Sequence, residues 1–244
     1  MTDPGTTDDP EPRSLRGRPP RAALTQDRIL DAAASLIERE GPDALTLRRL
    51  GADLGSNHTA VLRHFSSKDD ILLGLTERLI AEAIDGFEAS EDWRDTLAAL
   101  ARRMRRVCLA HPRIAVLVTS RVSRREAEFQ GADIVIGALG QAGFDHRDAA
   151  RYYRALVETS LAMGAFEASF AALDPEARAG DRRAWRREYL LASPARHPHL
   201  AAAAPYLAEA DEDDHFETTL ALLLDAVELR ARRTREARPA PTRD

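Results

Sequence analysis

Cysteine is nearly absent from this chain of 244 residues, because Cys108 is the only one. A single thiol excludes an internal disulfide and a cluster of thiolate metal ligands, and it fits a reducing compartment. No apolar run approaches the length of a membrane span, and the N-terminus lacks the basic-then-apolar pattern of a secretory signal. We therefore expect a cytoplasmic protein that does not enter a membrane.

Aromatic residues and lysine are also scarce. Aromatic residues make up 5% of the sequence, and the alternating pattern typical of strands is rare. Lys68 is the only lysine among 35 basic residues. Alanine, leucine, arginine and glutamate dominate instead, which is a composition typical of helices. The sequence therefore predicts an all-α protein, long enough for one large or two small domains.

The formal net charge of −5 is unevenly distributed along the chain. Residues 13–68 carry nine arginines and Lys68 against six acids, whereas residues 69–244 carry 25 basic residues against 30 acidic ones. A basic head on an acidic body is typical of a module that contacts phosphates, attached to a domain that does not.

The first 23 residues are rich in proline and poor in hydrophobic residues, so we predict a disordered basic arm over 1–23. Within it, Arg16 and Arg18 flank Gly17, a form suited to insertion into the minor groove of A·T-rich DNA. The alternative interpretation of this arm is a solubilising tail.

Four helices are expected between residues 25 and 88, each beginning after a residue that can cap it: Thr25, Thr46, Asn57 and Ser67. Gly41-Pro42 ends the first helix, and Gly55 ends the second. Phe65 closes the small core, and Asp70 offers the second half of a capping box. Two short helices joined by a turn that contains glycine have the form of a helix-turn-helix.

Residues 24–75 carry short motifs in a fixed order. They are Ile29-Leu30-Asp31-Ala32-Ala33, Gly41, Thr46-Leu47-Arg48, Leu54-Gly55 and His64-Phe65-Ser66-Ser67-Lys68. This stretch resembles the DNA-binding domain of the tetracycline-repressor (TetR) family nearly throughout. One departure is Leu62, which stands where the family usually has a tyrosine that touches a phosphate. The match covers about fifty residues in order, so it is specific.

The resemblance implies a helix-turn-helix domain over 24–69, a ligand-binding and dimerisation domain over 70–234, and a disordered tail over 235–244. It also implies that Arg48 reads a base edge and that the start of the recognition helix reads sequence. Lys68 is expected to anchor a phosphate, although an ordinary surface charge is the alternative. His64 is expected either to contact a backbone phosphate or simply to pack against neighbouring side chains. The candidate DNA-binding residues are Arg16, Arg18, Thr46, Arg48, Asn57, His58, Thr59, Leu62, His64 and Lys68.

The larger domain is expected to hold helices near 70–88, 93–109, 112–118, 124–142, 146–172 and 213–233, with a loop or irregular helix near 174–185. Motifs such as Trp93-Arg94-Asp95 and His111-Pro112-Arg113 resemble tetracycline-type members of the family. The last helix has an apolar stripe at helical spacing: Phe216, Leu220, Leu223, Leu224 and Val227. We predict that this stripe seals a homodimer through a four-helix bundle, the alternative being burial within the same protomer.

The tetracycline-type drug and metal positions correspond to Leu100, Met104 and either Leu117 or Val118, and none of these side chains ligates magnesium. The pocket is therefore expected to bind a largely apolar effector without metal or cofactor. Ser120, Arg121 and Tyr152 are the polar candidates to orient it, and Phe166 completes the predicted lining. His197, His199, His215 and the acids at 209–214 fit a solvated loop better than a metal site.

The sequence holds no Gly-rich phosphate loop, nucleophile elbow or zinc-protease motif, so we expect no enzyme. The leading hypothesis is a transcriptional repressor that a small molecule releases from a palindromic operator. Its two reading heads would have to lie about 34–36 Å apart to occupy successive major grooves. The alternatives are an architectural DNA-binding protein without an effector, and a small-molecule enzyme with a vestigial head.

Overall fold

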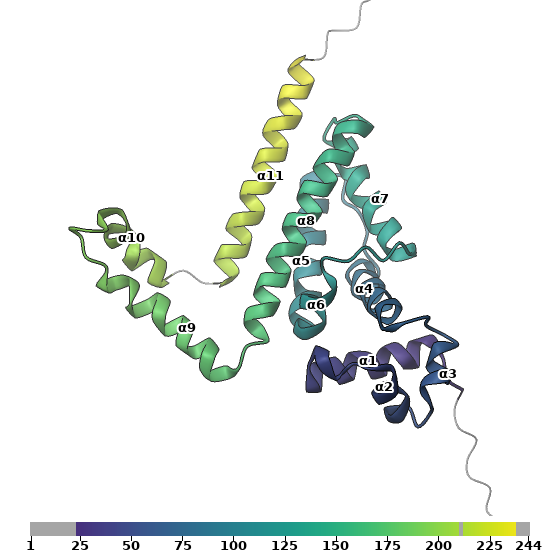
Figure 1. The fold of residues 1–244 in the computed structure, drawn as a ribbon. Helices are drawn as coiled ribbons and strands as arrows, with labels where there is room; N and C mark the ends of the chain where they lie inside the picture. Colours follow the sequence, from purple (N-terminus) through teal and green to yellow (C-terminus); the bar gives the residue numbers. More distant parts are fainter. Residues whose placement is uncertain (1–22, 210–211, 238–244) are drawn as a thin grey trace, which may run out of the picture.

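The computed structural model describes residues 23–209 and 212–237 of the chain, and within these residues all regular structure is helical (Figure 1). The prediction of an all-α protein is therefore confirmed. The elements are α1 (Gln26–Glu40), the 3₁₀ turn η1 (Pro42–Ala44), α2 (Leu47–Asp53), α3 (His58–Leu62), α4 (Lys68–Ile84), α5 (Trp93–Ala110), α6 (Pro112–Val118), α7 (Glu126–Gln141), α8 (His146–Ala171), α9 (Pro175–Arg187), the 3₁₀ turn η2 (Tyr189–Leu191), α10 (Pro198–Glu209) and α11 (Glu212–Ala237).

The four predicted helix caps are confirmed. The side-chain oxygens of Thr25, Thr46, Asn57 and Ser67 each accept a hydrogen bond from a backbone N–H in the first turn, at 3.3, 3.1, 2.9 and 3.1 Å. Asp70 bonds back to the N–H of Ser66 at 2.9 Å, one residue earlier than a standard capping box. The turn between α2 and α3 passes through Gly55 at φ +61°, where a side chain would be strained.

The two helices of the helix-turn-helix approach each other most closely at Gly51, which is buried in α2. A Cβ atom placed there would lie 2.9 Å from the carbonyl carbon of Asn57 and 3.0 Å from the backbone nitrogen of His58. Both neighbours are backbone atoms and cannot turn aside. The start of α3 is therefore held at a distance that only a residue without a sizeable side chain permits.

One apolar core runs without a break from the head into the body of the molecule. It joins Ile29, Leu36, Ile37, Leu50, Val61 and Phe65 of the head to Ile71 and Leu75 of α4, Ile114, Ala115 and Val118 of α6, Cys108 of α5 and Ala168 of α8. Polar contacts reinforce the junction. The N–H of Ile114 donates to a Glu38 carboxylate oxygen at 3.1 Å, and Arg113 donates to the backbone carbonyl of Glu38 at 3.1 Å. The first turn of α6 is thus fastened to the end of α1.

A second core lies at the end of the body far from the head, where side chains of α11 cluster with those of α5, α7 and α8. It buries Phe216, Leu220, Leu224 and Val227, whose exposed fractions are all 5% or less, and it partly covers Leu223. The guanidinium of Arg105 lies 4.6 Å from the centre of the Phe216 ring. The expectation that this stripe faces a second protomer is therefore wrong for Phe216, Leu220, Leu224 and Val227, because their own chain covers them, whereas Leu223 remains partly exposed.

The predicted helices of the body are confirmed with small shifts at their ends, and two regions differ. The region 174–185 is a regular helix, α9, whose first turn is capped by Asp174 through the N–H of Glu176 at 2.8 Å. The helix α10 was not predicted. At the C-terminus, α11 continues to Ala237, so residues 235–237 are helical and do not belong to a disordered tail. The rest of that tail and the arm over 1–22 lie outside the described residues.

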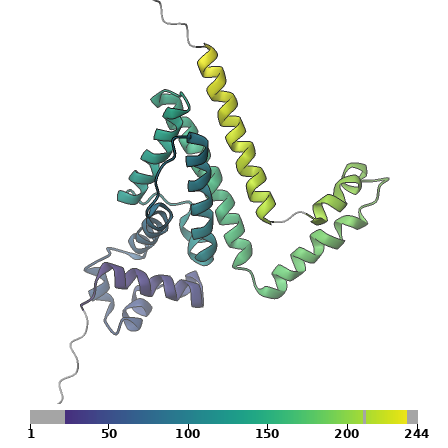
Figure 2. The ribbon, with the colours of Figure 1, turned by 180° about the vertical axis from the view of Figure 1, so that it is seen from behind.

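The helices α9 and α10 project away from the body (Figures 1 and 2). They pack on each other and on η2. Large apolar side chains in this projecting region are exposed, with Leu191 at 82% and Tyr206 at 75%. The body itself consists of α4–α8 with α11 along one side.

We predict that Gly51→Val lowers the free energy of unfolding by about 1–3 kcal/mol, because two branched methyl groups would meet backbone atoms that cannot move aside. Thermal or urea unfolding measures the effect. Gly137→Val on α7 is the matched control, since a Cβ atom there has no neighbour within 4 Å. It should change stability by less than about 0.5 kcal/mol. Equal effects of the two substitutions would contradict the close packing of α2 on α3.

Candidate DNA-binding surface and internal cavity

Two neighbouring arginines in the first turn of α2 have different surroundings. Arg49 forms ion pairs with Glu40 at 2.8 Å and with Asp53 at 3.2 Å. Arg48 is exposed, and no carboxylate in the described part of the chain pairs with it. The structure therefore leaves Arg48 available for an external partner while it neutralises Arg49.

The start of α3 presents His58 and Thr59, which are both exposed. Asn57 is exposed as well, but its side-chain oxygen is already used as the helix cap, which leaves only its NH₂ group to donate. Thr46 has the same capping role at α2. Leu62 is 40% exposed at the end of α3 and offers an apolar contact.

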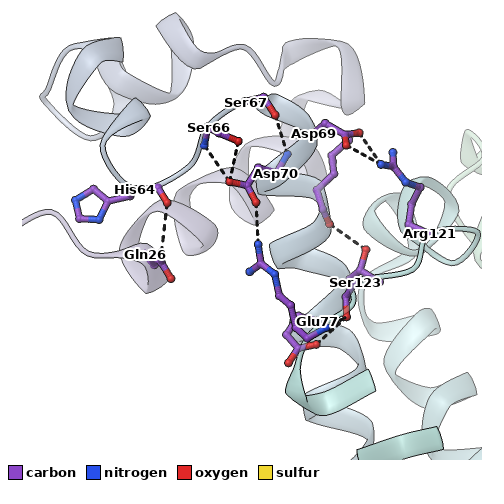
Figure 3. A network of polar contacts seen from close by, with 12 residues as sticks. Gln26, His64, Ser66, Ser67, Asp69, Asp70, Glu77, Arg121 and Ser123 are labelled. Carbon is purple, nitrogen blue, oxygen red and sulfur yellow. Dashed lines mark hydrogen bonds and ion pairs between the residues drawn. The ribbon is translucent and has the colours of Figure 1, made fainter. Parts of the chain in front are cut away.

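His64 and Lys68 lie where the chain passes from α3 into α4. His64 is half-buried, and its backbone carbonyl accepts a hydrogen bond from Gln26 at 3.3 Å (Figure 3). The exposed Lys68 donates from Nζ to the carbonyl of Pro42 at 3.3 Å. An ammonium group has three donors, so this contact leaves Lys68 able to bind a phosphate oxygen. Arg16 and Arg18 lie outside the described residues.

The sequence analysis missed Arg63, which follows α3 directly. Its side chain is exposed and has no partner among the described residues. Its position between the exposed Leu62 and the predicted contact His64 was the available signal.

A cavity that opens to solvent lies among α4, α5, α7 and α8, and residues at the end of α6 and on α11 complete its wall. Of the predicted lining residues, Leu100, Met104, Val118 and Arg121 lie on its wall. The wall is otherwise mostly aliphatic, with side chains such as Leu79, Ile80, Leu97, Val135, Leu156 and Leu220.

The other predicted lining residues lie elsewhere. Leu117 packs on the core shared with the head, and Tyr152 packs on Phe144 with ring centres 4.7 Å apart. Ser120 is exposed, and Phe166 is 72% exposed on α8. None of the four lies on the cavity wall, so their assignment to it is wrong.

The polar side chains on the cavity wall include Thr76, Thr119, Glu128, Tyr153 and Ser160. Burial, and to a lesser extent the nearby carboxylate of Glu128, raise the pKa of Tyr153 above its ordinary value. Its phenol therefore stays protonated and can donate a hydrogen bond. These groups were not predicted, because the spacing of residues in the sequence does not show which side of each helix faces a cavity.

A polar network joins one end of the cavity to the start of α4 (Figure 3). Arg121 pairs with Asp69 at 2.7 Å, and Arg125 pairs with Asp70 at 2.9 Å. Deeper in the body, the Ser123 hydroxyl lies 2.9 Å from a carboxylate oxygen of Glu77. The segment between α6 and α7 is thus attached to the helix that enters the head.

Among the described residues, no group of three or more histidine, cysteine, aspartate or glutamate side chains is arranged to hold a metal ion. No single helix in the same residues is long and apolar enough to cross a membrane. One bent pair, α8 with the segment from Pro175 to Leu191, satisfies that test by length and composition alone.

A capped helix-turn-helix with an unpaired arginine on its surface, joined by a continuous core to a helical body with a cavity, defines a one-component DNA-binding regulator. Comparison with known families identifies the particular one. Residues 29–75 match the model for bacterial regulatory proteins of the tetR family, and residues 87–231 match the tetracyclin repressor-like C-terminal domain. The chain belongs to the TetR family of transcriptional regulators, which is not a family of enzymes.

Individual relatives agree with this assignment. An HTH-type transcriptional regulator of Saccharopolyspora erythraea is 32% identical over 75% of each chain. The class A tetracycline repressor of transposon 1721 from Escherichia coli is 30% identical over 84% of this chain and 90% of its own. ActR of Streptomyces coelicolor, solved in complex with actinorhodin, has the same fold, with a TM-score of 0.75 at 24% identity over 86% of this chain and 99% of its own.

Proposed function

We propose that this chain is a repressor that binds a palindromic operator as a homodimer and releases it when a small molecule fills the cavity. The observation that carries the proposal is the attachment of both α4 and α6 to the head, while both helices also contribute to the wall of the cavity. A ligand that favours another arrangement of these helices changes the spacing of the two heads. Its place of action is the cytoplasm, where DNA and metabolites are both accessible.

In this proposal Arg48 reads a base edge, and His58, Thr59 and the amide of Asn57 read neighbouring bases in the major groove. Lys68, His64 and Arg63 contact phosphates, and Leu62 contributes no hydroxyl contact. The Arg16–Arg18 arm enters the minor groove beside the site. Phosphate contacts fix the position of the head, while base contacts supply the specificity.

The proposed dimer uses the faces of α8 and α11 that point away from the body. Leu222 is 65% exposed and Leu229 is 50% exposed, and seven residues separate them, so they lie on one face of α11. Phe166 is exposed on α8, which lies beside α11 (Figures 1 and 2). A four-helix bundle of two such pairs would cover these side chains. The helices are those predicted from the sequence, but the face of α11 is the opposite one.

The proposed effector is a molecule with a large apolar body that needs no metal. Aliphatic side chains dominate the cavity, and burial of apolar surface contributes about 25 cal/mol per Å². One relative is named a tetracycline repressor, and ActR was solved in complex with actinorhodin. The wall positions Leu100 and Met104 provide no metal ligand, which distinguishes this cavity from one built for a metal-chelated drug.

The operator is identified by sequencing the DNA fragments that the purified protein retains. On the selected duplex, we predict that Arg48→Ala costs about 1–3 kcal/mol of binding free energy but changes binding to a scrambled duplex little, because the lost contacts are to bases. Lys68→Ala should weaken both duplexes alike. Arg49→Ala is the matched control and should have a smaller effect, since Glu40 and Asp53 already occupy that guanidinium. An equal loss on both duplexes for Arg48→Ala would remove its assigned role.

We predict that the double change Leu222→Glu and Leu229→Glu converts the dimer to a monomer, because two unpaired carboxylates in an apolar seam are costly to bury. Sedimentation velocity gives the oligomeric state. Phe129→Glu is the control: this side chain is 60% exposed on α7, a helix that is not part of the proposed seam, and the variant should remain a dimer. A double variant that sediments as wild type would show that the seam lies elsewhere.

A further inference from the structure

Arg121 belongs to the cavity and to the attachment of the head at the same time. It lies on the cavity wall, just after α6, and its side chain is about one-third exposed. One guanidinium nitrogen, Nη2, lies 2.7 and 2.8 Å from the two carboxylate oxygens of Asp69 in the first turn of α4 (Figure 3). Arg121 therefore connects the cavity wall to the DNA-facing end of α4 through its ion pair with Asp69.

Arg121 also has donors to spare. A guanidinium carries five N–H donors, and in the described part of the chain only Asp69 accepts from Arg121. Among the residues on the cavity wall it is the only basic side chain, and Glu128 is the only acidic one. The carboxylate of Glu128 is already occupied, because it accepts from the N–H of Arg124 at 2.7 Å and lies 2.9 Å from the Ser123 hydroxyl.

We propose that Arg121 binds an anionic group of the effector, such as a carboxylate, sulfonate or phenolate, and gives up Asp69 in doing so. The inference rests on the proposed ligand response of the cavity and names the class of ligand: an apolar body with one acidic end. The apolar wall holds the body, and the guanidinium orients the acidic end by charge-assisted hydrogen bonds. The sequence analysis expected a largely apolar effector with Arg121 among the polar candidates to orient it, and the proposal adds an acidic group on the ligand and a partner, Asp69, that the ligand displaces.

Loss of the Arg121–Asp69 pair acts directly on the DNA-facing surface. Asp69 follows Lys68, the proposed phosphate anchor, and its side chain is 58% exposed. Without Arg121, its carboxylate would stand unpaired beside that anchor and repel the DNA backbone. The neighbouring pair of Arg125 with Asp70 does not involve the cavity wall and stays in place. The ligand therefore changes one of the contacts that attach α4 to the segment after α6 and leaves the others in place.

The test uses two fluorescent probes with the same skeleton: the anion 8-anilinonaphthalene-1-sulfonate and the uncharged N-phenyl-1-naphthylamine. The wild-type protein should bind both. Arg121→Gln should weaken binding of the sulfonate about tenfold and change binding of the uncharged probe less than twofold. Asp69→Asn should strengthen binding of the sulfonate several-fold, because it removes the negative charge that competes for the guanidinium, and leave the uncharged probe unaffected.

Arg125→Gln is the matched control, since it removes an equivalent arginine–aspartate pair that does not touch the cavity. It should leave both probe affinities within twofold of wild type. Circular dichroism and thermal unfolding confirm that each variant is folded. On the selected operator duplex, saturating sulfonate should weaken wild-type binding several-fold and Asp69→Asn binding less.

Unchanged sulfonate affinity in Arg121→Gln, or an equal loss for the two probes, would overturn the inference. So would a loss of sulfonate affinity in Arg125→Gln as large as that in Arg121→Gln. The probe measurements need no DNA, so they remain valid even if the purified protein retains no duplex. That result would contradict the proposed repressor function but not the role of Arg121. If neither probe bound the wild-type protein, both the cavity as a ligand site and the role of Arg121 would fall.

Discussion

The attachment of α6 to α1 is the contact on which the rest of the structure depends. Ile114 and Ala115 enter the core of the head, while Glu38 accepts from the N–H of Ile114 and thereby satisfies one of the free amides at the start of α6. Apolar burial supplies the stability of this junction, and the hydrogen bonds set its register. Because α6 also carries Val118 to the cavity wall, the two functional regions share one short helix.

The arrangement of individual charges on the head, and not its net charge, makes it suited to binding DNA. Residues 24–68 hold five arginines and Lys68 against six acids, so the basic balance of residues 13–68 comes from the arginines at 13–23. Inside the head, several acids have partners within the chain: Asp31 pairs with Arg78 at 2.7 Å, and Glu40 pairs with Arg49. Among the described residues, Arg48 and Arg63 on the outer surface have no ion-pair partner. A phosphate-binding face can thus form on a head without net charge.

The head was predictable because its determinants are local. Caps such as Thr25 and Asn57 act within one turn of helix, and the glycine-containing turn has a fixed conformation, so short motifs specified these elements. The regular α9 helix was predicted only as a loop or irregular helix because its sequence is strongly charged and has few apolar residues, and its Asp174-Pro175 start was the clearest local signal. Packing was harder to predict. The stripe on α11 was identified correctly, but a sequence pattern does not show whether its cover comes from the same chain or another. The same limit explains why Arg121 was placed in the cavity but its partner Asp69, fifty-two residues away, was not.

The continuous core has a consequence for protein engineering. Regulators with new input–output combinations are often sought by joining the reading head of one protein to the sensor body of another at the end of the helix-turn-helix. In this chain a junction near residue 69 would cut through a single folding unit, since Ile71, Leu75, Ile114 and Val118 complete the same apolar cluster as Ile37 and Phe65. A working hybrid would have to exchange the inner face of α4 and the first turn of α6 together with the head. Compatibility between donor and recipient would then depend on about two turns of buried side chains, of which those on α6 lie far from the splice in sequence.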